Sequence, residues 1–394
     1  MRASVLTAPA PAARALPQRE RALFLYSPVG GGHYHASRAV MDAWLAHHPA
    51  RSAETLDYLR FMPAWERRLW PGLYLLALRH WPSLWRRYRC WTNRPSEPRF
   101  IRDRVTHVGV RAFAEVLRAT RPGLVVSTIG GAAALAGAAR ARLAAEGVSF
   151  VNALVVSGFR AHHHWARAEA DLFFVSCDEA KADLVARGIE ASRVSVVGIP
   201  IASDVAPLEG EAKTRARARL GLGADPVIVV SSGATGAYRA LDDLLAVLAR
   251  AGRPMDVLVF KGAARPGVER RGAVRVHRLG VRDDFCAWLA ASDLVVGKLG
   301  GHTAAEAFAA GVPIVVYQPI PGQEEENAAW VEAAGAAVWP RDRRALEATL
   351  ARLLDGAAGR AARAAMARVA RRLARPDAAA QIARALERAR EPRP

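Results

Sequence analysis

Short apolar runs alternate with longer stretches of helical sequence along most of the chain. The run RALFLYS at 21–27 predicts a buried strand, and a helix is expected from about 34 to 47, after a glycine turn. Further strands are predicted at 124–128, 150–156, 172–176 and 194–197. Strands that alternate with helices form parallel sheets through right-handed crossovers, so this half of the chain predicts a Rossmann-like domain.

The alternation stops at 198–211, a segment with two prolines and two glycines, and then starts again. Strands are predicted at 227–231, 257–260, 294–296 and 314–317, and helices at 240–250 and 284–291. We therefore expect a flexible leader at 1–20, one α/β domain at 21–202, a second at 203–375 and a last segment at 376–394. Ligands of open parallel sheets bind beyond the carboxyl ends of the strands, which places the active site in the cleft between the domains.

The chain of 394 residues has a net charge of +19, and nearly all of its positive side chains are arginines. Such a charge attracts anionic lipid, nucleic acid or phosphorylated substrates. Cys90, Cys177 and Cys286 form no CxxC pair, which favours a reducing cytosol and predicts neither disulfides nor a zinc site. No run of about twenty apolar residues predicts a membrane-spanning helix, and the leader lacks the apolar core of a signal peptide.

A glycine turn joins a strand to a helix after Val296, in the sequence GKLGGHTAAEA. The first N–H groups of such a helix point outward and its dipole favours negative charge, so a phosphate is the expected ligand. Glu306 lies near one turn beyond Thr303 and can reach a sugar hydroxyl beside that phosphate. Gln323 and Glu324 follow the next strand and suit further hydroxyls. A nucleotide sugar meets all of these requirements.

The pattern Lys-x-Gly-Gly-x-Thr-x-x-Glu-Ala, followed by Gly-x-Pro and Pro-Gly-Gln-Glu-x-x-Asn, resembles the donor half of diacylglycerol glycosyltransferases. This family contains the monogalactosyldiacylglycerol synthases and the processive diacylglycerol glucosyltransferases. The resemblance implies a GT-B fold, with two Rossmann-like domains facing each other across a cleft and a last helix, here 378–390, that packs back on the first domain. An alanine-rich crossover helix behind an ordinary glycine turn is the alternative.

The resemblance also implies donor-binding roles. It assigns the diphosphate to Lys298, Gly300, Gly301 and Thr303, the ribose to Glu306, and the transferred sugar to Gln323 and Glu324, with Asn327 closing the motif. Ser232 and Gly233 stand where the family has a second glycine turn near the phosphates. Lys261 is expected to face the same cleft, and the segment that begins at Val281 matches the part of the family whose backbone contacts uracil.

The N-terminal turn SPVGGGHYHA resembles the first-domain motif GGGHxxA of the same family. Gly31 and Gly32 allow the backbone to approach the donor phosphates and the acceptor. His33 is the expected general base, because an imidazole at the positive end of a helix is neutral at pH 7 and can take a proton from an acceptor hydroxyl. A capping or buried structural histidine is the alternative.

The segment 60–94 contains half of the ten tryptophans and eight arginines against one acidic residue. This composition is typical of helices that lie in a membrane interface, with tryptophan at headgroup depth and arginine on anionic phosphates. The residues expected to face the membrane or a lipid acceptor are Trp65, Trp70, Trp81, Trp85, Arg86 and Arg87. An arginine-rich helix pair with its tryptophans in the core is the alternative. No nucleic-acid-binding motif accompanies the segment, so no nucleic acid is expected as a partner.

The segment SGFRAHHHWARAEADLFFVS (157–176) resembles a further block of the family. The family has an aspartate where this chain has Gly158, which affects the expected activity, mechanism or choice of acceptor. His162 is a candidate for orienting the acceptor. Three histidines in a row also raise the possibility of a metal site, but adjacent side chains diverge and no carboxylate accompanies them.

These patterns lead to one functional hypothesis. The resemblance implies an inverting glycosyltransferase that moves a hexose from a UDP-sugar to diacylglycerol or glycosyl-diacylglycerol, without a metal or cofactor. It is expected to bind the anionic cytoplasmic face of the cell membrane peripherally, and the sequence carries no signal for an oligomeric state. The alternatives are a UDP-sugar transferase for another lipid such as a polyprenyl-linked precursor, a UDP-sugar epimerase, and a UDP-sugar-binding protein that has lost turnover.

Overall fold

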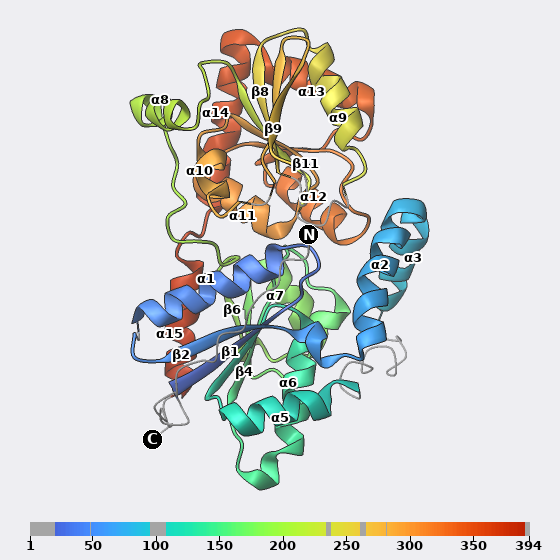
Figure 1. Ribbon diagram of the computed structural model, residues 1–394, viewed down its shortest axis with the longest axis vertical. Helices are drawn as coiled ribbons and strands as arrows, with labels where there is room; N and C mark the ends of the chain where they lie inside the picture. Colours follow the sequence, from blue (N-terminus) through green and yellow to red (C-terminus); the bar gives the residue numbers. More distant parts are fainter. Residues whose placement is uncertain are drawn as a thin grey trace.

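The computed structural model describes residues 20–47, 49–94, 108–233, 238–260, 265–280 and 282–390, which form two α/β domains stacked along the long axis of the molecule (Figure 1). The first domain contains a six-stranded parallel sheet in the order β2-β1-β3-β4-β5-β6. Its strands are β1 (Arg21–Tyr26), β2 (Ser52–Asp57), β3 (Leu124–Ser127), β4 (Val151–Val155), β5 (Leu172–Val175) and β6 (Val194–Val196). β3 and most of β1 and β4 are buried.

The second domain contains a seven-stranded sheet in the order β13-β12-β11-β7-β8-β10-β9, in which only the edge strand β9 pairs antiparallel. Its strands are β7 (Val227–Ser231), β8 (Met255–Phe260), β9 (Gly267–Arg271), β10 (Val274–Arg278), β11 (Leu294–Gly297), β12 (Ile314–Val316) and β13 (Ala337–Val338). The central strands β7 and β11 are buried along their whole length, as expected for a parallel sheet between two layers of helices.

Helices cover both sheets. In the first domain they are α1 (Gly32–His47), α2 (Ala64–His80), α3 (Pro82–Thr92), α5 (Val110–Thr120), α6 (Gly130–Arg142) and α7 (Asp178–Val185). The second domain has α8 (Gly210–Arg219), α9 (Leu241–Arg250), α10 (Phe285–Ala290), α11 (Gly301–Ala310), α12 (Gln323–Ala333), α13 (Arg343–Leu354) and α14 (Gly356–Leu373). Helices α2 and α3 form a hairpin that stands beside the second domain (Figure 1).

The last helix, α15 (Ala378–Arg390), lies on the first domain, although α14 before it lies on the second (Figure 1). Ile382 and Leu386 are fully buried in one apolar cluster with Trp44 of α1. Arg51 and Glu387 form a two-bond ion pair at the end of this contact, with distances of 2.5 and 2.9 Å. The chain therefore passes between the domains twice, once after β6 and once between α14 and α15.

Buried apolar residues of the two domains form a continuous cluster, which contains Phe159 from the first domain and Phe308 from the second. The ring of Phe159 also stacks on Trp330 of α12, with centroids 4.3 Å apart. The domains thus meet over a packed interface, and the start of α1 lies against the start of α11.

Candidate active site

A cavity of about 900 Å³ lies between the two domains, beyond the carboxyl ends of β1, β7 and β11. Its walls are the glycine turn before α1, the start of α11, the loop before α12 and the segment 201–204. Tyr74, Trp85 and Arg89 of the α2–α3 hairpin also line it. This is the edge of the sheets at which open α/β folds bind their ligands.

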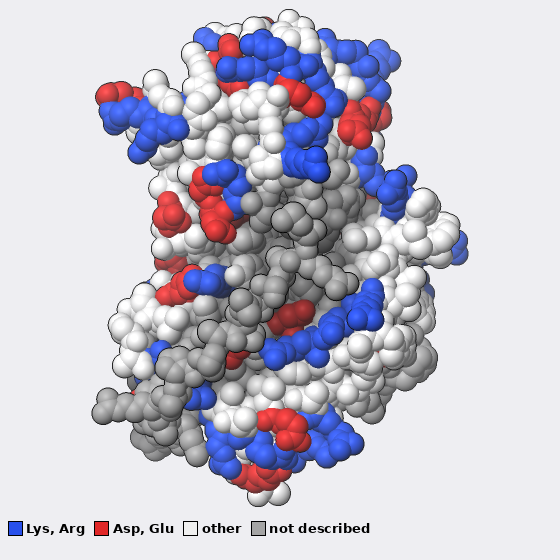
Figure 2. All heavy atoms as spheres, viewed as in Figure 1, with Lys and Arg blue, Asp and Glu red and all other residues white. Residues whose placement is uncertain are grey.

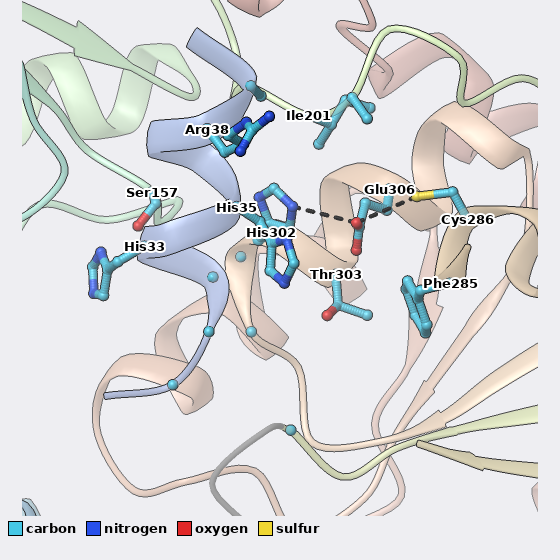
Figure 3. Close-up of a pocket in the computed structure, with 18 of the residues that line it drawn as sticks. His33, His35, Arg38, Ser157, Ile201, Phe285, Cys286, His302, Thr303 and Glu306 are labelled. Atoms are coloured by element: carbon cyan, nitrogen blue, oxygen red, sulfur yellow. Dashed lines mark hydrogen bonds and ion pairs between the residues drawn. The ribbon is translucent and has the colours of Figure 1, made fainter. Parts of the chain in front are cut away.

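The turn before α1 places the expected base, His33, among the residues that line this cavity, with its ring on the side of α1 that faces away from Glu306 (Figure 3). Gly30 and Gly31 have φ angles of +100° and +71°, which only glycine adopts without strain. His33 follows in the first turn of α1, and its backbone carbonyl accepts a hydrogen bond from Thr128 Oγ1 at 3.1 Å. Among the described residues, the ring atom Nδ1 of His33 has no hydrogen-bond partner.

The surroundings keep the His33 imidazole neutral. Burial lowers its pKa from 6.5 to about 4, an effect to which nearby His302 adds and which a hydrogen bond with the Thr128 backbone opposes. At pH 7 the ring therefore carries a free lone pair, as a general base requires.

The start of α11 forms the opposite wall. Its N-cap residue, Gly300, makes no side-chain cap, so the first N–H groups of the helix stay available to a ligand. At Gly301 an added Cβ would lie 2.1 Å from the carbonyl oxygen of Ser157, so glycine is what lets the two domains touch here. Thr303 lines the cavity in the first turn, and Glu306 lines it one turn further on (Figure 3).

Glu306 is almost fully buried and is held by two other side chains. His302 Nε2 lies 3.3 Å from Glu306 Oε1, and the Cys286 thiol donates to the same oxygen at 3.5 Å. Burial, the Glu306 charge and this hydrogen bond raise the pKa of Cys286, so the thiol keeps its proton. The ring of His302 stacks on His35 of α1, with centroids 5.7 Å apart.

Lys298 and Glu324 form an ion pair of 2.6 Å inside the cavity. The second carboxylate oxygen of Glu324 accepts the backbone N–H of Ile320 at 2.8 Å, which fixes the loop before α12. Gly233, with φ of +72°, leaves room for the Lys298 side chain, because an added Cβ would lie 2.6 Å from Lys298 Cε. Lys298, which is expected to bind the phosphate, and Glu324, which is expected to bind the sugar, are thus paired with each other.

Most of the other predicted donor residues also line the cavity. They are Gly31, Gly32, Ser232, Gly233, Gly300, Gly301 and Gln323. The Ser232 hydroxyl donates to the carbonyl of Phe260 at 2.6 Å, so its contribution to the turn is structural. Lys261 and Val281 lie outside the described residues.

Asn327 and His162 do not line the cavity. The side chain of each forms hydrogen bonds with backbone groups of other segments. Asn327 of α12 accepts the backbone N–H of Phe159 at 3.1 Å and donates to the carbonyl of Leu299 at 3.3 Å, so it bridges the two domains. His162 has both ring nitrogens engaged, Nε2 with the carbonyl of Arg89 and Nδ1 with the backbone N–H of His164. Burial lowers the pKa of His162 to about 3, and the charges of Arg89 and His164 add to this.

The glycine that replaces the family aspartate, Gly158, lies beside this bridge. A Cβ added at Gly158 would lie 3.5 Å from the Asn327 side-chain oxygen, an ordinary contact. The backbone has room for a side chain there, but its outer atoms would meet an amide that already links the domains.

The α2–α3 hairpin exposes large apolar side chains. Trp65 and Trp81 are 59% and 55% exposed, and Leu69, Leu73, Leu76, Leu84, Tyr88 and Trp91 are also exposed. A hairpin with its tryptophans in the core would bury these two, so that alternative is wrong for them; the side chain of Trp70 lies outside the described residues. In Figure 2 this region is largely uncharged, with basic side chains at its border.

The opposite side of the hairpin contacts the second domain. Trp85 is half-buried between Tyr74 and Tyr88, at centroid distances of 5.1 and 5.4 Å. Arg86 binds Glu325 of α12 through two hydrogen bonds of 2.5 and 3.0 Å, whereas Arg87 is exposed. The hairpin therefore joins an apolar surface to the helix that carries Gln323 and Glu324.

Several residues at the site were not predicted from the sequence. His302 occupies a variable position of the glycine motif, His35 and Cys286 have no pattern of their own, and Tyr74 and Arg89 fell within the membrane segment without a separate role. The i, i+4 spacing of His302 and Glu306 on one helix is the signal that could have indicated their contact. Among the described residues, no group of three or more histidine, cysteine, aspartate or glutamate side chains is arranged to hold a metal ion, and metal-free chemistry stays a prediction.

Comparison with known proteins confirms the family resemblance. Residues 33–201 match the family model of monogalactosyldiacylglycerol (MGDG) synthase. The processive diacylglycerol beta-glucosyltransferase of Bacillus pumilus is 31% identical over 191 residues, which is 47% of this chain and 49% of that protein. The enzyme of the same name from Staphylococcus aureus is 30% identical over 191 residues, 46% of this chain and 48% of that protein. The chain thus spans about half the length of the curated relatives it matches.

Solved structures confirm the predicted GT-B fold. MurG of Acinetobacter baumannii superposes with a TM-score of 0.59 at 15% identity, covering 94% of this chain and 99% of that one. Anabaena HepE in complex with UDP-glucose superposes with a TM-score of 0.55 at 15% identity, covering 93% of this chain and 99% of that one. The UDP-GlcNAc 2-epimerase of Neisseria meningitidis, bound to UDP-GlcNAc, gives 0.58 at 12% identity and covers 93% and 100%. At such identities the likeness establishes the fold alone.

Proposed function

We propose that this protein is an inverting glycosyltransferase that moves a hexose from a UDP-sugar to diacylglycerol or glycosyl-diacylglycerol. The observation that carries the proposal is the cavity between the domains. The cavity is lined by the neutral His33 of the first domain and by the uncapped start of α11 with the buried Glu306. The α2–α3 hairpin, which has an apolar outer surface, lines it as well. The match to the MGDG synthase family and the curated relatives support the same activity.

The donor would bind to the second domain. The diphosphate would lie at the start of α11, where backbone N–H groups and Lys298 supply positive charge, and the ribose would lie against Glu306. Lys298 is paired with Glu324 before the donor arrives. Diphosphate binding would therefore draw Lys298 away and release Glu324 for the hydroxyls of the transferred sugar.

The chemical step would be a single displacement. His33 belongs to the first domain and the expected diphosphate site to the second, so a sugar held between them would be attacked from the side away from its leaving group, which would invert its anomeric carbon. His33 would take the proton of the acceptor hydroxyl, while the α11 N–H groups and Lys298 would stabilise the charge on the departing UDP. Because His33 Nδ1 is enclosed, its ring must turn or its neighbours must move before a hydroxyl reaches that atom.

The acceptor would arrive from a membrane. The exposed tryptophans and leucines of the α2–α3 hairpin suit the interface of a bilayer, and the net charge of +19 suits an anionic one. Tyr74 and Trp85 of the same hairpin line the cavity, so a lipid could pass from the membrane to His33 along one element. Among the helices that the structure describes, none is long and apolar enough to cross a bilayer. We propose that the protein binds the cytoplasmic face of the cell membrane peripherally, through this hairpin.

The test is transfer by the full chain onto lipid. Purified protein is mixed with vesicles that contain diacylglycerol or glycosyl-diacylglycerol and with UDP-glucose, UDP-galactose or UDP-N-acetylglucosamine, and products are identified by mass spectrometry. The parent should form a glycolipid. His33→Gln should lower turnover by about 10²-fold or more, the usual effect of losing a general base, while UDP binding by calorimetry stays within about twofold.

The outcomes separate the alternatives. Turnover of His33→Gln within about threefold of the parent would show that another group is the base. Product only on additional vesicles that contain a polyprenyl-linked precursor would change the acceptor. Release of free sugar without an acceptor would indicate an epimerase, and UDP binding without any product would indicate a binding protein. No heat of UDP association with folded parent protein would overturn the proposal as a whole.

A further inference from the structure

The expected ribose ligand, Glu306, is held by a neighbour on its own helix. His302 Nε2 lies 3.3 Å from Glu306 Oε1, and both side chains are about nine-tenths buried. An ionised carboxylate has no hydrogen to donate, so this contact is favourable only with a hydrogen on His302 Nε2. Cys286 donates to the same oxygen. Among the described residues, no hydrogen bond reaches the second oxygen, Oε2.

The His302 ring is itself fixed from the other domain. It stacks on His35 of α1 with an interplanar angle of 26°. Gly32 adds a close contact, because a Cβ at that position would lie 3.2 Å from His302 Cβ. A ring packed between two domains has few alternative rotamers, so the direction of its N–H is set by both (Figure 3).

We propose that His302 is a positioning residue for nucleotide recognition, whose Nε2 contacts Oε1 of Glu306 and orients this carboxylate so that Oε2 meets the ribose hydroxyls of the donor. The inference rests on the proposed function, because it takes a UDP-sugar as the ligand. It adds a role for a residue that the glycine motif leaves variable.

The experiment uses two substitutions that separate the polar contact with Glu306 from the packing of the ring. His302→Phe keeps a flat ring against His35 but removes the N–H donor. His302→Gln removes the ring but keeps an N–H group that can reach Glu306. Calorimetry on the full chain measures the Kd of UDP and of 2′,3′-dideoxy-UDP, which has the same base and diphosphate but no ribose hydroxyls.

For His302→Phe we expect the Kd of UDP to rise about tenfold, because the carboxylate that meets the ribose loses its polar contact with the ring nitrogen, and the Kd of dideoxy-UDP to stay within about twofold. His302→Gln should bind UDP within about threefold of the parent. Glu306→Gln should show the same selective loss of UDP. Combining it with His302→Phe should add little, because the two residues act as one unit.

A loss of equal size for both ligands in His302→Phe would overturn the inference, since it would mean a role in packing or at the diphosphate. Unchanged UDP affinity in this variant would overturn it as well. Should His302→Phe fail to fold, His302→Leu, which also lacks a ring nitrogen, is compared on the same two ligands, and a selective loss of UDP affinity is again expected. Failure of the parent to bind UDP would instead reject the proposed function.

Discussion

The protonation of His33 is set by burial, since its surroundings lower the pKa to about 4. A protonated imidazole cannot accept a proton, so the acid limb of kcat/KM should follow this lowered value. We expect activity on neutral-lipid vesicles to hold from pH 8 to below pH 6 and to fall by half near pH 4. A free histidine would instead lose half of its basic form at 6.5.

The measurement is the pH dependence of kcat/KM for transfer onto diacylglycerol. His35→Gln is the control, since burial and the His302 charge also lower the pKa of His35, which faces the same cavity. Its profile should keep the midpoint of the parent. A midpoint near 6.5 in the parent would mean that the base is a more exposed group than His33 or that the closed cleft opens before the proton moves.

Single residues were predictable from the sequence where a motif specified backbone geometry. The glycines of both turns and Glu306 lie in the cavity because strand, turn and helix follow one another in the chain. The contacts of His162 and His302 were not predictable from the sequence, because the residues that surround them come from distant segments. His162 is enclosed by α3, some 70 residues earlier in the chain, and His302 by the first turn of α1. Such contacts leave no local pattern.

At the scale of elements, the α2–α3 hairpin has two different sides, one exposed and apolar, the other on the cavity and α12. Replacing Trp65 and Trp81 by serine removes two exposed aromatic rings. We expect the partition onto phosphatidylglycerol vesicles to fall by about tenfold or more, because each ring loses a favourable place at headgroup depth. The affinity for UDP should not change.

Vesicle sedimentation measures this partition. Val268→Ser is the matched control, since Val268 is 65% exposed on β9, away from the hairpin, and its loss should leave the partition within about twofold. If the double tryptophan variant folds and still sediments like the parent, the hairpin does not carry the membrane contact.

The ion pair between Arg86 and Glu325 joins this hairpin to the first turn of α12. Because Arg86 is about half exposed, the pair should contribute less than about 1 kcal/mol to stability. Its effect should instead be on position, since Gln323 and Glu324 adjoin Glu325. Arg86→Glu should raise the KM for the UDP-sugar about threefold to tenfold, and Arg86→Glu with Glu325→Arg should restore it.

Steady-state kinetics with thermal melting measure both effects. Arg87→Glu, one residue along on the exposed side, carries the same charge change and should leave the KM for UDP-sugar near that of the parent. Equal effects of the two arginine variants, or no recovery in the charge swap, would contradict a specific link from α3 to α12.

The elements themselves were predictable where burial makes them apolar. β1, β3, β4, β7 and β11 coincide with apolar runs. β2 was missed because its sequence, SAETLD, lies at a sheet edge with one buried residue. β9 was missed for the same reason, since GVERR is mostly exposed. Periodicity detects runs dominated by apolar residues, such as the edge strand β6, and misses strands with several polar or charged residues, such as the inner strand β10 with the sequence VRVHR.

At the scale of the whole molecule, the cavity exists because the domains are in contact. Asn327 bridges them, Phe159 stacks on Trp330, and Gly301 touches the backbone of Ser157. In the proposed function the base lies on one domain and the donor elements on the other, so transfer would require this contact while UDP binding to the second domain would require little of it. A substitution that separates the domains should therefore lower the rate of transfer more than it lowers the affinity for UDP.

Gly301→Ala makes this separation. Its Cβ would lie 2.1 Å from the Ser157 carbonyl oxygen, and a backbone atom cannot yield as a side chain can. Gly300→Ala is the matched control on the same helix start, because its Cβ would lie 4.0 Å from the nearest atom, a Glu324 oxygen. Both variants place one methyl group near the expected diphosphate site, so any difference between them is due to the domain contact.

We expect Gly301→Ala to have the larger radius of gyration by small-angle scattering and about 10²-fold lower transfer than Gly300→Ala, with a similar Kd for UDP. Equal transfer in the two variants would mean that the closed arrangement is not the one in which the sugar moves, and that His33 reaches the acceptor in another relation of the domains.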